Sequence, residues 1–297
     1  MKKYTNILLI AMMALMSSCL DEDLKDQLYE EDIYNNANNI YINAVAVLYN
    51  YIGGSTDSEG LQGTCRGIYD YNTLTTDEAM IPIRGGDWYD GGLWENMYLH
   101  KWNANDLPLY NTWKYLYKVV VLSNKSLSVI DTYGHLLNEE QKNAYQAEVR
   151  AVRALFYYYI MDMYGRVPLV TSCNDTQDEV KQSERSEVFR FIVNELQEIV
   201  TSLPDEHSNR MGNYYGRITA PVVHFLLAKL ALNAEIYCDD NWTDGIRPNG
   251  KELFFHVDGE QLNAWETCIR YCDKLAESGY VLEKDYSYNF AVHNENS

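Results

Sequence analysis

The chain has 297 residues, a formal net charge of −19 and 46% hydrophobic residues. This charge excludes an ordinary nucleic-acid-binding surface, because contacts to phosphates need clustered Lys and Arg, and it disfavours adsorption to anionic headgroups. The apolar content excludes a disordered chain, since it supplies ample surface for a core. The length is sufficient for one large helical domain or two smaller ones.

The first residues have the features of a secretory signal. Lys2 and Lys3 precede an apolar run over residues 7–16, which is too short to span a bilayer. Small residues in the sequence Met16-Ser17-Ser18-Cys19 resemble a lipobox, although Met stands where Leu is usual. We therefore expect residues 1–18 to be a lipoprotein signal peptide and Cys19 to carry the lipid anchor. An ordinary secretory signal with an incidental Cys is the alternative.

Acidic residues follow Cys19 directly, in the sequence Leu20-Asp21-Glu22-Asp23. This cluster resembles the surface-export signal of Bacteroidetes lipoproteins, and the alternative is a solvated linker. Several acyl chains on Cys19 would hold a soluble domain firmly, because each buried methylene contributes about 0.8 kcal/mol. We expect the domain to stand off an outer membrane on its tether, facing the cell exterior.

Apolar residues recur at helical spacing in six segments. Asn138 and Gln141 form a capping-box pattern at the start of one segment, Gly165 ends it, and Pro204 ends the next one. Pro221 lies in a first turn, where a missing N–H costs nothing. The expected helices span about residues 30–51, 110–131, 138–165, 186–203, 219–238 and 261–278.

The spacing of the expected helices predicts the fold class. Helical pairs of about 25–35 residues favour a mainly α fold of stacked, tetratricopeptide-like hairpins, although the strict consensus is absent. Each pair needs its neighbours to cover its apolar face. Short strands are expected only near residues 167–171 and in loops. Stripe residues expected on buried faces include Val47, Val121, Leu262, Trp265, Ile269, Cys272 and Leu275.

Cysteine use does not indicate a disulfide framework. Five cysteines remain after Cys19, an odd number. Cys268 and Cys272 share the apolar face of the last expected helix. A metal pair would need two further ligands at suitable spacing, so buried free thiols are the better interpretation.

Several motifs closely resemble the SusD/RagB family. The sequence Ala147 to Tyr158, followed by Tyr164-Gly165-Arg166-Val167-Pro168-Leu169-Val170, is similar to its central signature, an Arg-Ala-aromatic helix ending in Tyr-Gly-x-x-Pro-Leu. Gly216-Arg217-Ile218-Thr219 resembles the start of the next hairpin. The loop signature is similar to Thr76-Asp77-Glu78-Ala79 and to the run from Arg84 to Gly92, and Trp113, Tyr117, Asn124 and the closing Asn294 to Ser297 also fit.

The resemblance implies a helical, non-enzymatic lipoprotein. It would bind oligosaccharide at the cell surface and deliver it to a SusC-like, TonB-dependent outer-membrane transporter. Family members are longer, so residues 19–297 are expected to form the N-terminal part of the fold, with the C-terminal part absent. The alternatives are a binder of peptide or another nutrient, a surface glycosidase, or a scaffold without a small-molecule site.

The candidate ligand-binding residues lie within a long irregular stretch, Gly53 to Asn105, which is long enough to be functional. They are Arg84, Asp87, Trp88, Tyr89 and Trp94. Aromatic rings hold the C–H face of a sugar while polar groups bind its hydroxyls, and ring contacts are worth about 0.5–1.5 kcal/mol. Neighbouring glycines permit close approach. The alternative is a loop folded back with its tryptophans buried.

Three other features of the sequence bear on function. Arg150 and Arg153 are expected to pair with acidic groups and stack on rings rather than bind anions. The Asp239 to Gly245 run suggests either a calcium loop or an exposed turn, and no Glu occupies the twelfth position of an EF-hand. No Gly-x-Ser-x-Gly, His-Glu-x-x-His or phosphate loop is present, so no catalytic residue or required cofactor is expected. The 43 acidic residues leave the pair of catalytic carboxylates of a glycosidase as an alternative.

Overall fold

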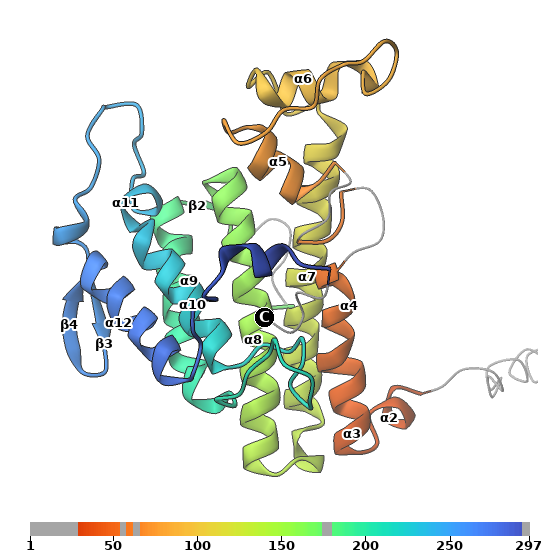
Figure 1. Cartoon of the computed structure of the whole chain (residues 1–297). Coiled ribbons are helices and arrows are strands. Elements are labelled where there is room, and N and C mark those ends of the chain that lie inside the picture. The colour runs from red at the N-terminus through yellow and green to blue at the C-terminus, as the bar shows by residue number, and fades with distance from the viewer. Residues whose placement is uncertain (1–28, 54–57, 62–65, 174–179, 293–297) are drawn as a thin grey trace, which may run out of the picture.

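The structure is a computed structural model that describes residues 29–53, 58–61, 66–173 and 180–292. The predicted signal peptide, the Cys19 anchor and the closing Asn294 to Ser297 motif lie outside the described residues. The described chain is a stack of helices with two small strand pairs (Figure 1). This confirms the mainly α, tetratricopeptide-like fold class.

The first expected helix is interrupted. It consists of α2 (Glu30–Ile33), α3 (Ala37–Ile40), the π-helical η1 (Tyr41–Ala46) and α4 (Val47–Gly53). Asn36 caps α3 by accepting a hydrogen bond from the Asn39 N–H. The π turn adds a residue to the helical repeat, so Val45 faces the core and Val47 is exposed. The prediction that Val47 would be buried is wrong for this reason.

Two long helices, α7 (Leu107–Thr132) and α8 (Glu139–Tyr164), form the central hairpin through the short η3 (Gly134–Leu136). The predicted capping box is present, because Asn138 accepts from the Gln141 N–H and Gln141 accepts from the Asn138 N–H. Gly165 ends α8 with φ 72°. Val121 was predicted to be buried but is 54% exposed, because no helix of the described ranges covers that side of α7.

The second half of the stack continues with α9 (Arg185–Ile199) and η4 (Val200–Ser202), then α10 (Ala220–Leu232) and α11 (Ala234–Tyr237). Pro221 lies in the first turn of α10, as predicted. A single helix over 219–238 was expected. Asn233 interrupts it, and its side chain donates to the Lys229 carbonyl instead of continuing the helix.

A hairpin precedes the last long helix. β3 (Phe254–Val257) pairs antiparallel with β4 (Glu260–Asn263) around Asp258 and Gly259, both at positive φ. Leu262 therefore belongs to a strand, and α12 (Ala264–Glu277) begins later than predicted, at an Asn263 cap. The remaining short elements are β1 (Val167–Pro168), which pairs with β2 (Gln182–Ser183), η5 (Gly250–Glu252) and η6 (Tyr286–Phe290).

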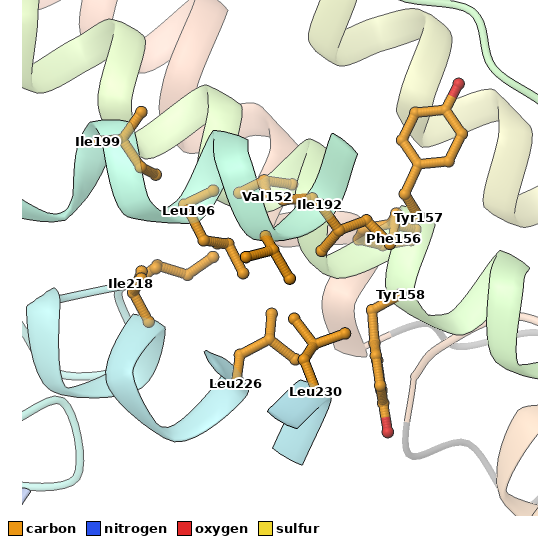
Figure 2. Packing of buried hydrophobic residues seen from close by; sticks show 14 of the residues in the cluster. Val152, Phe156, Tyr157, Tyr158, Ile192, Leu196, Ile199, Ile218, Leu226 and Leu230 are labelled. Carbon is orange, nitrogen blue, oxygen red and sulfur yellow. The ribbon is translucent and has the colours of Figure 1, made fainter. Parts of the chain in front are cut away.

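The main core lies where α8 meets α7, α9 and α10. Phe156 and Tyr157 of α8 are fully buried, as are Ile192 and Leu196 of α9 and Leu230 of α10 (Figure 2). Truncating one of these aromatic residues to Ala typically costs about 3–5 kcal/mol. The signature helix α8 is therefore the structural centre of the stack.

Charged side chains lock α8 to its neighbours. Arg150 and Arg153 both pair with Glu195 of α9, each at 2.6 Å, and Arg153 lies over the Phe191 ring. Burial alone would raise the pKa of Glu195, but the hydrogen bonds from the two arginines outweigh it, so the pKa is lowered from 4.5. This confirms the prediction that the signature arginines pair with acidic groups, and for Arg153 that it also stacks on a ring.

A second, smaller core carries the long loop. α5 (Ile68–Leu74) and α6 (Leu93–Tyr98) bury Tyr71, Leu74, Trp94 and Met97 against each other. Met163 of α8 packs against both this cluster and the main core. The α5–α6 unit thus stands at one end of the central hairpin (Figure 1), and it positions the candidate site.

Candidate functional site

The loop between α5 and α6 contains a tight turn at Arg84 to Asp87. The Arg84 N–H donates to the Asp87 carbonyl at 3.2 Å, and the Asp87 N–H donates to the Arg84 carbonyl at 3.0 Å. Gly85 takes φ 64° within this turn, a conformation that glycine adopts without steric cost. The turn leaves the side chains of Arg84 and Asp87 exposed.

Asp90 anchors the end of the loop. Its Oδ2 atom accepts from the Trp94 indole N–H at 2.7 Å and from Arg66 Nη2 at 3.1 Å. The Arg66 guanidinium also lies 5.9 Å from the centre of the Trp94 ring. The Asp90 carboxylate thus accepts charge-assisted hydrogen bonds from two donors in separate segments, which holds this end of the loop in place.

Trp94 lies under the loop rather than on it. It is only 4% exposed and belongs to the small core. The expectation that Trp94 would contact ligand therefore needs correction: the α6 helix turns this ring inward, and Asp90 satisfies its N–H. For this residue the alternative of a buried tryptophan is correct.

Trp88 and Tyr89 are the outward-facing rings of the loop. They are 56% and 54% exposed. The Trp88 ring contacts Trp94 edge-on, with 6.2 Å between ring centres. Trp88 and Asp90 both have positive φ, at 61° and 40°. Such backbone strain in non-glycine residues concentrates at ligand sites, and here it presents two adjacent aromatic side chains to solvent.

A small cleft of about 250 Å³ lies beside these rings. Its lining brings Arg84 and Trp88 together with Met80, Ile81 and Pro82. Of the five predicted contact residues, the structure thus joins two in one cleft, leaves Asp87 and Tyr89 exposed beside it, and buries Trp94. Met80 was not predicted, although it is an exposed apolar residue directly after Ala79 of the loop signature.

More aromatic residues lie between the end of α6 and the first turn of α7. The Trp102 ring contacts His100 with 5.1 Å between centres, and Tyr98 and Tyr110 are exposed nearby in the sequence. The sequence analysis did not select these residues. The signal was available in the density of aromatic residues over 98–110, outside the glycine-rich turn.

The Asp239 to Gly245 run forms a turn whose carboxylates accept hydrogen bonds from the chain itself. Asp240 accepts from the Ser186 N–H and hydroxyl at 2.9 and 2.6 Å, and Asp244 accepts from the Ile246 N–H at 2.8 Å. Within the described ranges no three His, Cys, Asp or Glu side chains cluster as metal ligands would. The Trp242 ring is exposed and lies 5.4 Å from the Arg166 guanidinium.

Comparisons with known proteins agree in one family. Residues 35–232 match the family model SusD-like_3, described as starch-binding and associating with the outer membrane. A SusD-like protein of Bacteroides ovatus is 26% identical over 84% of this chain and 43% of its own length. The starch-binding protein SusD of Bacteroides thetaiotaomicron is 27% identical over 63% of this chain and 32% of its own length.

Solved structures show the same fold. A SusD-like protein from Bacteroides fragilis superposes with a TM-score of 0.64 at 19% identity, covering 93% of this chain and 45% of that one. A laminarin-binding SusD-like protein gives 0.63 at 20% identity, covering 87% and 49%. The chain thus spans less than half the length of these relatives.

Among the described residues, no helix is both long and apolar enough to cross a bilayer.

The signature helix α8, the following hairpin and the loop unit all lie inside the part of the chain that this family model covers or directly adjoin it. The chain therefore belongs to the SusD-like family.

Proposed function

We propose that this protein captures oligosaccharide at the cell surface through the loop from Arg84 to Tyr89 and does not cleave it. The observation that carries the proposal is the adjacent, outward-facing pair Trp88 and Tyr89, beside a cleft that also holds Arg84. The pair is supported from below by Trp94 and Asp90.

This geometry matches the chemistry of a sugar. A pyranose offers a flat C–H face that packs on an exposed ring, and hydroxyl groups at its edge that bind charged or amide groups. Arg84 and Asp87 supply donors and acceptors at the edge of the aromatic pair. A site that is rigid before binding loses less conformational entropy on binding, and the Asp90 anchor supplies that rigidity.

The relatives support carbohydrate as the ligand class. One similar solved structure is described as a laminarin-binding SusD-like protein. Another, with a TM-score of 0.58 at 20% identity, is described as containing a xylogluco-oligosaccharide. Both glucans present repeated pyranose faces, so one exposed aromatic pair suits either.

The cellular setting is also part of the proposal. Acylated Cys19 would tether the acidic domain to the outer membrane. Removal of residues 1–18 with Lys2 and Lys3 changes the net charge from −19 to −21, which would keep the domain away from anionic headgroups. From there it would pass ligand to a SusC-like, TonB-dependent transporter. Replacing Cys19 with Ala is expected to release the protein from cells, and a cell-attached variant would contradict the anchor.

The binding site is tested by calorimetry with Trp88→Ala. Loss of the exposed ring is expected to weaken binding to laminarin, xyloglucan or starch oligosaccharides about tenfold, equivalent to about 1.4 kcal/mol. Trp242→Ala is the matched control, because Trp242 is exposed to a similar extent, 61% against 56%, but lies on another loop. Equal affinities of Trp88→Ala and the unmodified protein would remove this loop from the site.

The same protein preparation separates the competing functions. Titration with oligopeptides tests the peptide-binding alternative, and binding of peptides but not glycans would replace the proposed ligand class. A reducing-sugar assay on each glycan tests for cleavage. Release of sugar, abolished by substitution of one carboxylate, would establish a glycosidase and contradict the proposal.

A further inference from the structure

A pocket of about 510 Å³ lies among α9, α10, α12 and the β3–β4 turn. Its volume falls within the range of about 300–1,000 Å³ that is usual for small-molecule sites. It shares no lining residue with the cleft beside the loop from Arg84 to Tyr89, and it belongs to the main stack rather than to the α5–α6 unit (Figure 1). The glycan site proposed above therefore does not account for it.

The helix α12 has a covered face and an uncovered face. Its residues Ala264, Thr267 and Tyr271 are buried, and the helix packs on α10. Ile269, which was predicted to be buried, is 61% exposed, and Cys272 is exposed as well. The predictions of a buried Ile269 and a buried Cys272 thiol are therefore wrong, because no element of the described chain covers this face. The pocket lies on the covered side, where Tyr271 is only 4% exposed.

The lining of the pocket combines buried apolar residues with exposed carboxylates. Leu203, Ala220 and Val257 are the buried apolar residues. Asp205 and Asp258 are exposed. Ligand sites of this kind bury a ligand against apolar side chains and orient it through a few polar groups. A pyranose fits this combination, because it has apolar C–H faces and an edge of hydroxyl groups.

Hydrogen bonds inside the pocket hold a donor and an acceptor in place. Gln197 Nε2 donates to the His256 carbonyl at 2.9 Å and to the Tyr271 hydroxyl at 3.0 Å. Both amide protons are then used, so Gln197 Oε1 is left as an acceptor. The Tyr271 hydroxyl accepts from Gln197, and its own proton has no acceptor among the described residues. The pair thus offers a ligand one acceptor and one donor.

His224 adds an imidazole to the same wall. Its ring stacks on the Tyr271 ring with 5.8 Å between centres. Burial lowers the pKa of His224 below its ordinary value of 6.5, so the ring is neutral at pH 7. Its Nδ1 atom is buried without a partner among the described residues. The Nε2 atom is therefore the ring nitrogen that a ligand in the pocket can reach.

The charges of the pocket select against ions. Lys274, the only lysine or arginine in the lining, is already paired with Asp258 at 3.0 Å, so an anion would find no free counter-charge. One oxygen of Asp205 accepts from the Ser278 hydroxyl at 2.8 Å, and the other is left to accept from a ligand. Within the described ranges no three His, Cys, Asp or Glu side chains cluster as metal ligands would.

We propose that this pocket is a second carbohydrate site, which holds one neutral hexose unit, free or at the end of a short oligosaccharide, through its hydroxyl groups. Tyr271 and His224 would bind one part of the hydroxyl edge, while Gln197 and Asp205 accept from another. The buried apolar residues would cover a C–H face. The proposal does not depend on the loop from Arg84 to Tyr89, and either site can be absent without the other.

Histidine resonances report on the pocket directly, because His224 and His256 line it and His135 lies in η3. The full chain, labelled with ¹⁵N-histidine, is titrated with glucose, galactose, mannose and maltose. At least one sugar is expected to shift the His224 and His256 signals saturably and to leave the His135 signal unchanged. The same shifts are expected in Trp88→Ala, which lacks the exposed ring of the loop.

Two substitutions locate the contact. Asp205→Asn is expected to weaken this binding about tenfold, because a hydroxyl loses a charged acceptor. Glu206→Gln is the matched control, since it changes the net charge equally at an adjacent exposed residue outside the lining. His224→Phe keeps a ring against Tyr271 but removes the nitrogens, and about fivefold weaker binding is expected. Circular dichroism checks that each variant folds.

Three results would overturn the proposal. The first is the absence of a saturable shift with every sugar, including the case in which only zinc or phosphate moves the His224 signal. The second is an unchanged affinity in both Asp205→Asn and His224→Phe. The third is loss of the His224 and His256 shifts in Trp88→Ala, because it would show that sugar binds only at the loop.

Discussion

Asp90 ties together the residues that lie beneath Trp88. It joins Arg66 and Trp94 through one carboxylate oxygen, and Trp88 rests edge-on against Trp94. The φ of Asp90, 40°, is positive, a conformation that costs most side chains about 1–2 kcal/mol but Asn and Asp less. The acceptor and the backbone conformation together explain why an aspartate suits this position.

Substitutions of Asp90 test whether it positions the aromatic rings without contacting the glycan itself. Asp90→Ala is expected to weaken glycan binding about tenfold, or about 1.4 kcal/mol, because Trp94 loses its acceptor. Asp90→Asn keeps an acceptor oxygen and tolerates the backbone, so its affinity should stay close to that of the unmodified protein. Calorimetry at equal ionic strength measures both. Equal loss in the two variants would point to the charge itself and contradict the positioning role.

Glu195 gives the stack a defined acid sensitivity. Its pKa is lowered from 4.5 because its two arginine partners outweigh burial. A carboxyl whose folded pKa is lowered contributes stability above the unfolded pKa, and this contribution is lost as the pH falls through the folded pKa. The unfolding free energy should therefore decrease below about pH 4.5.

Glu195→Gln is expected to reduce the unfolding free energy at pH 7 by about 3 kcal/mol, because it leaves Arg153 buried beside a neutral partner. The difference between the variant and the unmodified protein should shrink at lower pH. Urea denaturation at pH 7 and pH 4 measures it. A constant difference at both pH values would show that the pair is not the source of the acid sensitivity.

At the level of elements, Gly165 ends the central helix and starts the turn to β1. Its φ of 72° and ψ of −105° lie in a region that residues with a Cβ rarely occupy. Gly165→Ala is expected to cost about 1–3 kcal/mol, measured as a lower melting temperature. Gly53→Ala is the control, since Gly53 is helical and has open space around its Cβ position. Equal melting temperatures for both variants would contradict this role.

Local sequence signals predicted where helices begin and end better than they predicted which of their residues are buried. Asn138, Gly165 and Pro221 act as the caps and breakers expected, because these effects depend on adjacent backbone. The β3–β4 hairpin was missed, although Asp258-Gly259 is a strong turn signal. Periodicity identified the apolar faces of α7 and α12, but it does not say which face a neighbour covers, so Val121 and Ile269 were misplaced.

The candidate site was predictable in part. The glycine-rich sequence indicated a turn, and the aromatic density indicated exposed rings, which Trp88 and Tyr89 confirm. The burial of Trp94 was not predictable, because it depends on Arg66 and on Tyr71, which come from a separate segment. Contacts between segments follow from the packing of α5 on α6, and no local pattern encodes them.

At the scale of the whole molecule, the two cores differ in size, and we therefore expect the helical stack and the α5–α6 unit to differ in local stability. The stack buries dozens of side chains, whereas the α5–α6 unit rests on a small cluster. Hydrogen exchange should therefore be slowest in the middle of α8 and distinctly faster in α5 and α6, because local opening follows the buried contacts. Saturating glycan should slow exchange in α6 and the preceding loop. Equal protection of both units without ligand would contradict the division.

The small core under the loop allows the loop sequence to vary independently of the helical stack. Because Met163 is the residue that packs against both clusters, most changes above it leave the packing of α8 with α7 and α9 untouched. Substitutions in the loop from Arg84 to Tyr89 are therefore expected to leave the packing of the helical stack intact. The same separation predicts that the segment from Ile68 to Tyr98 can be exchanged for that of a relative without unfolding the stack.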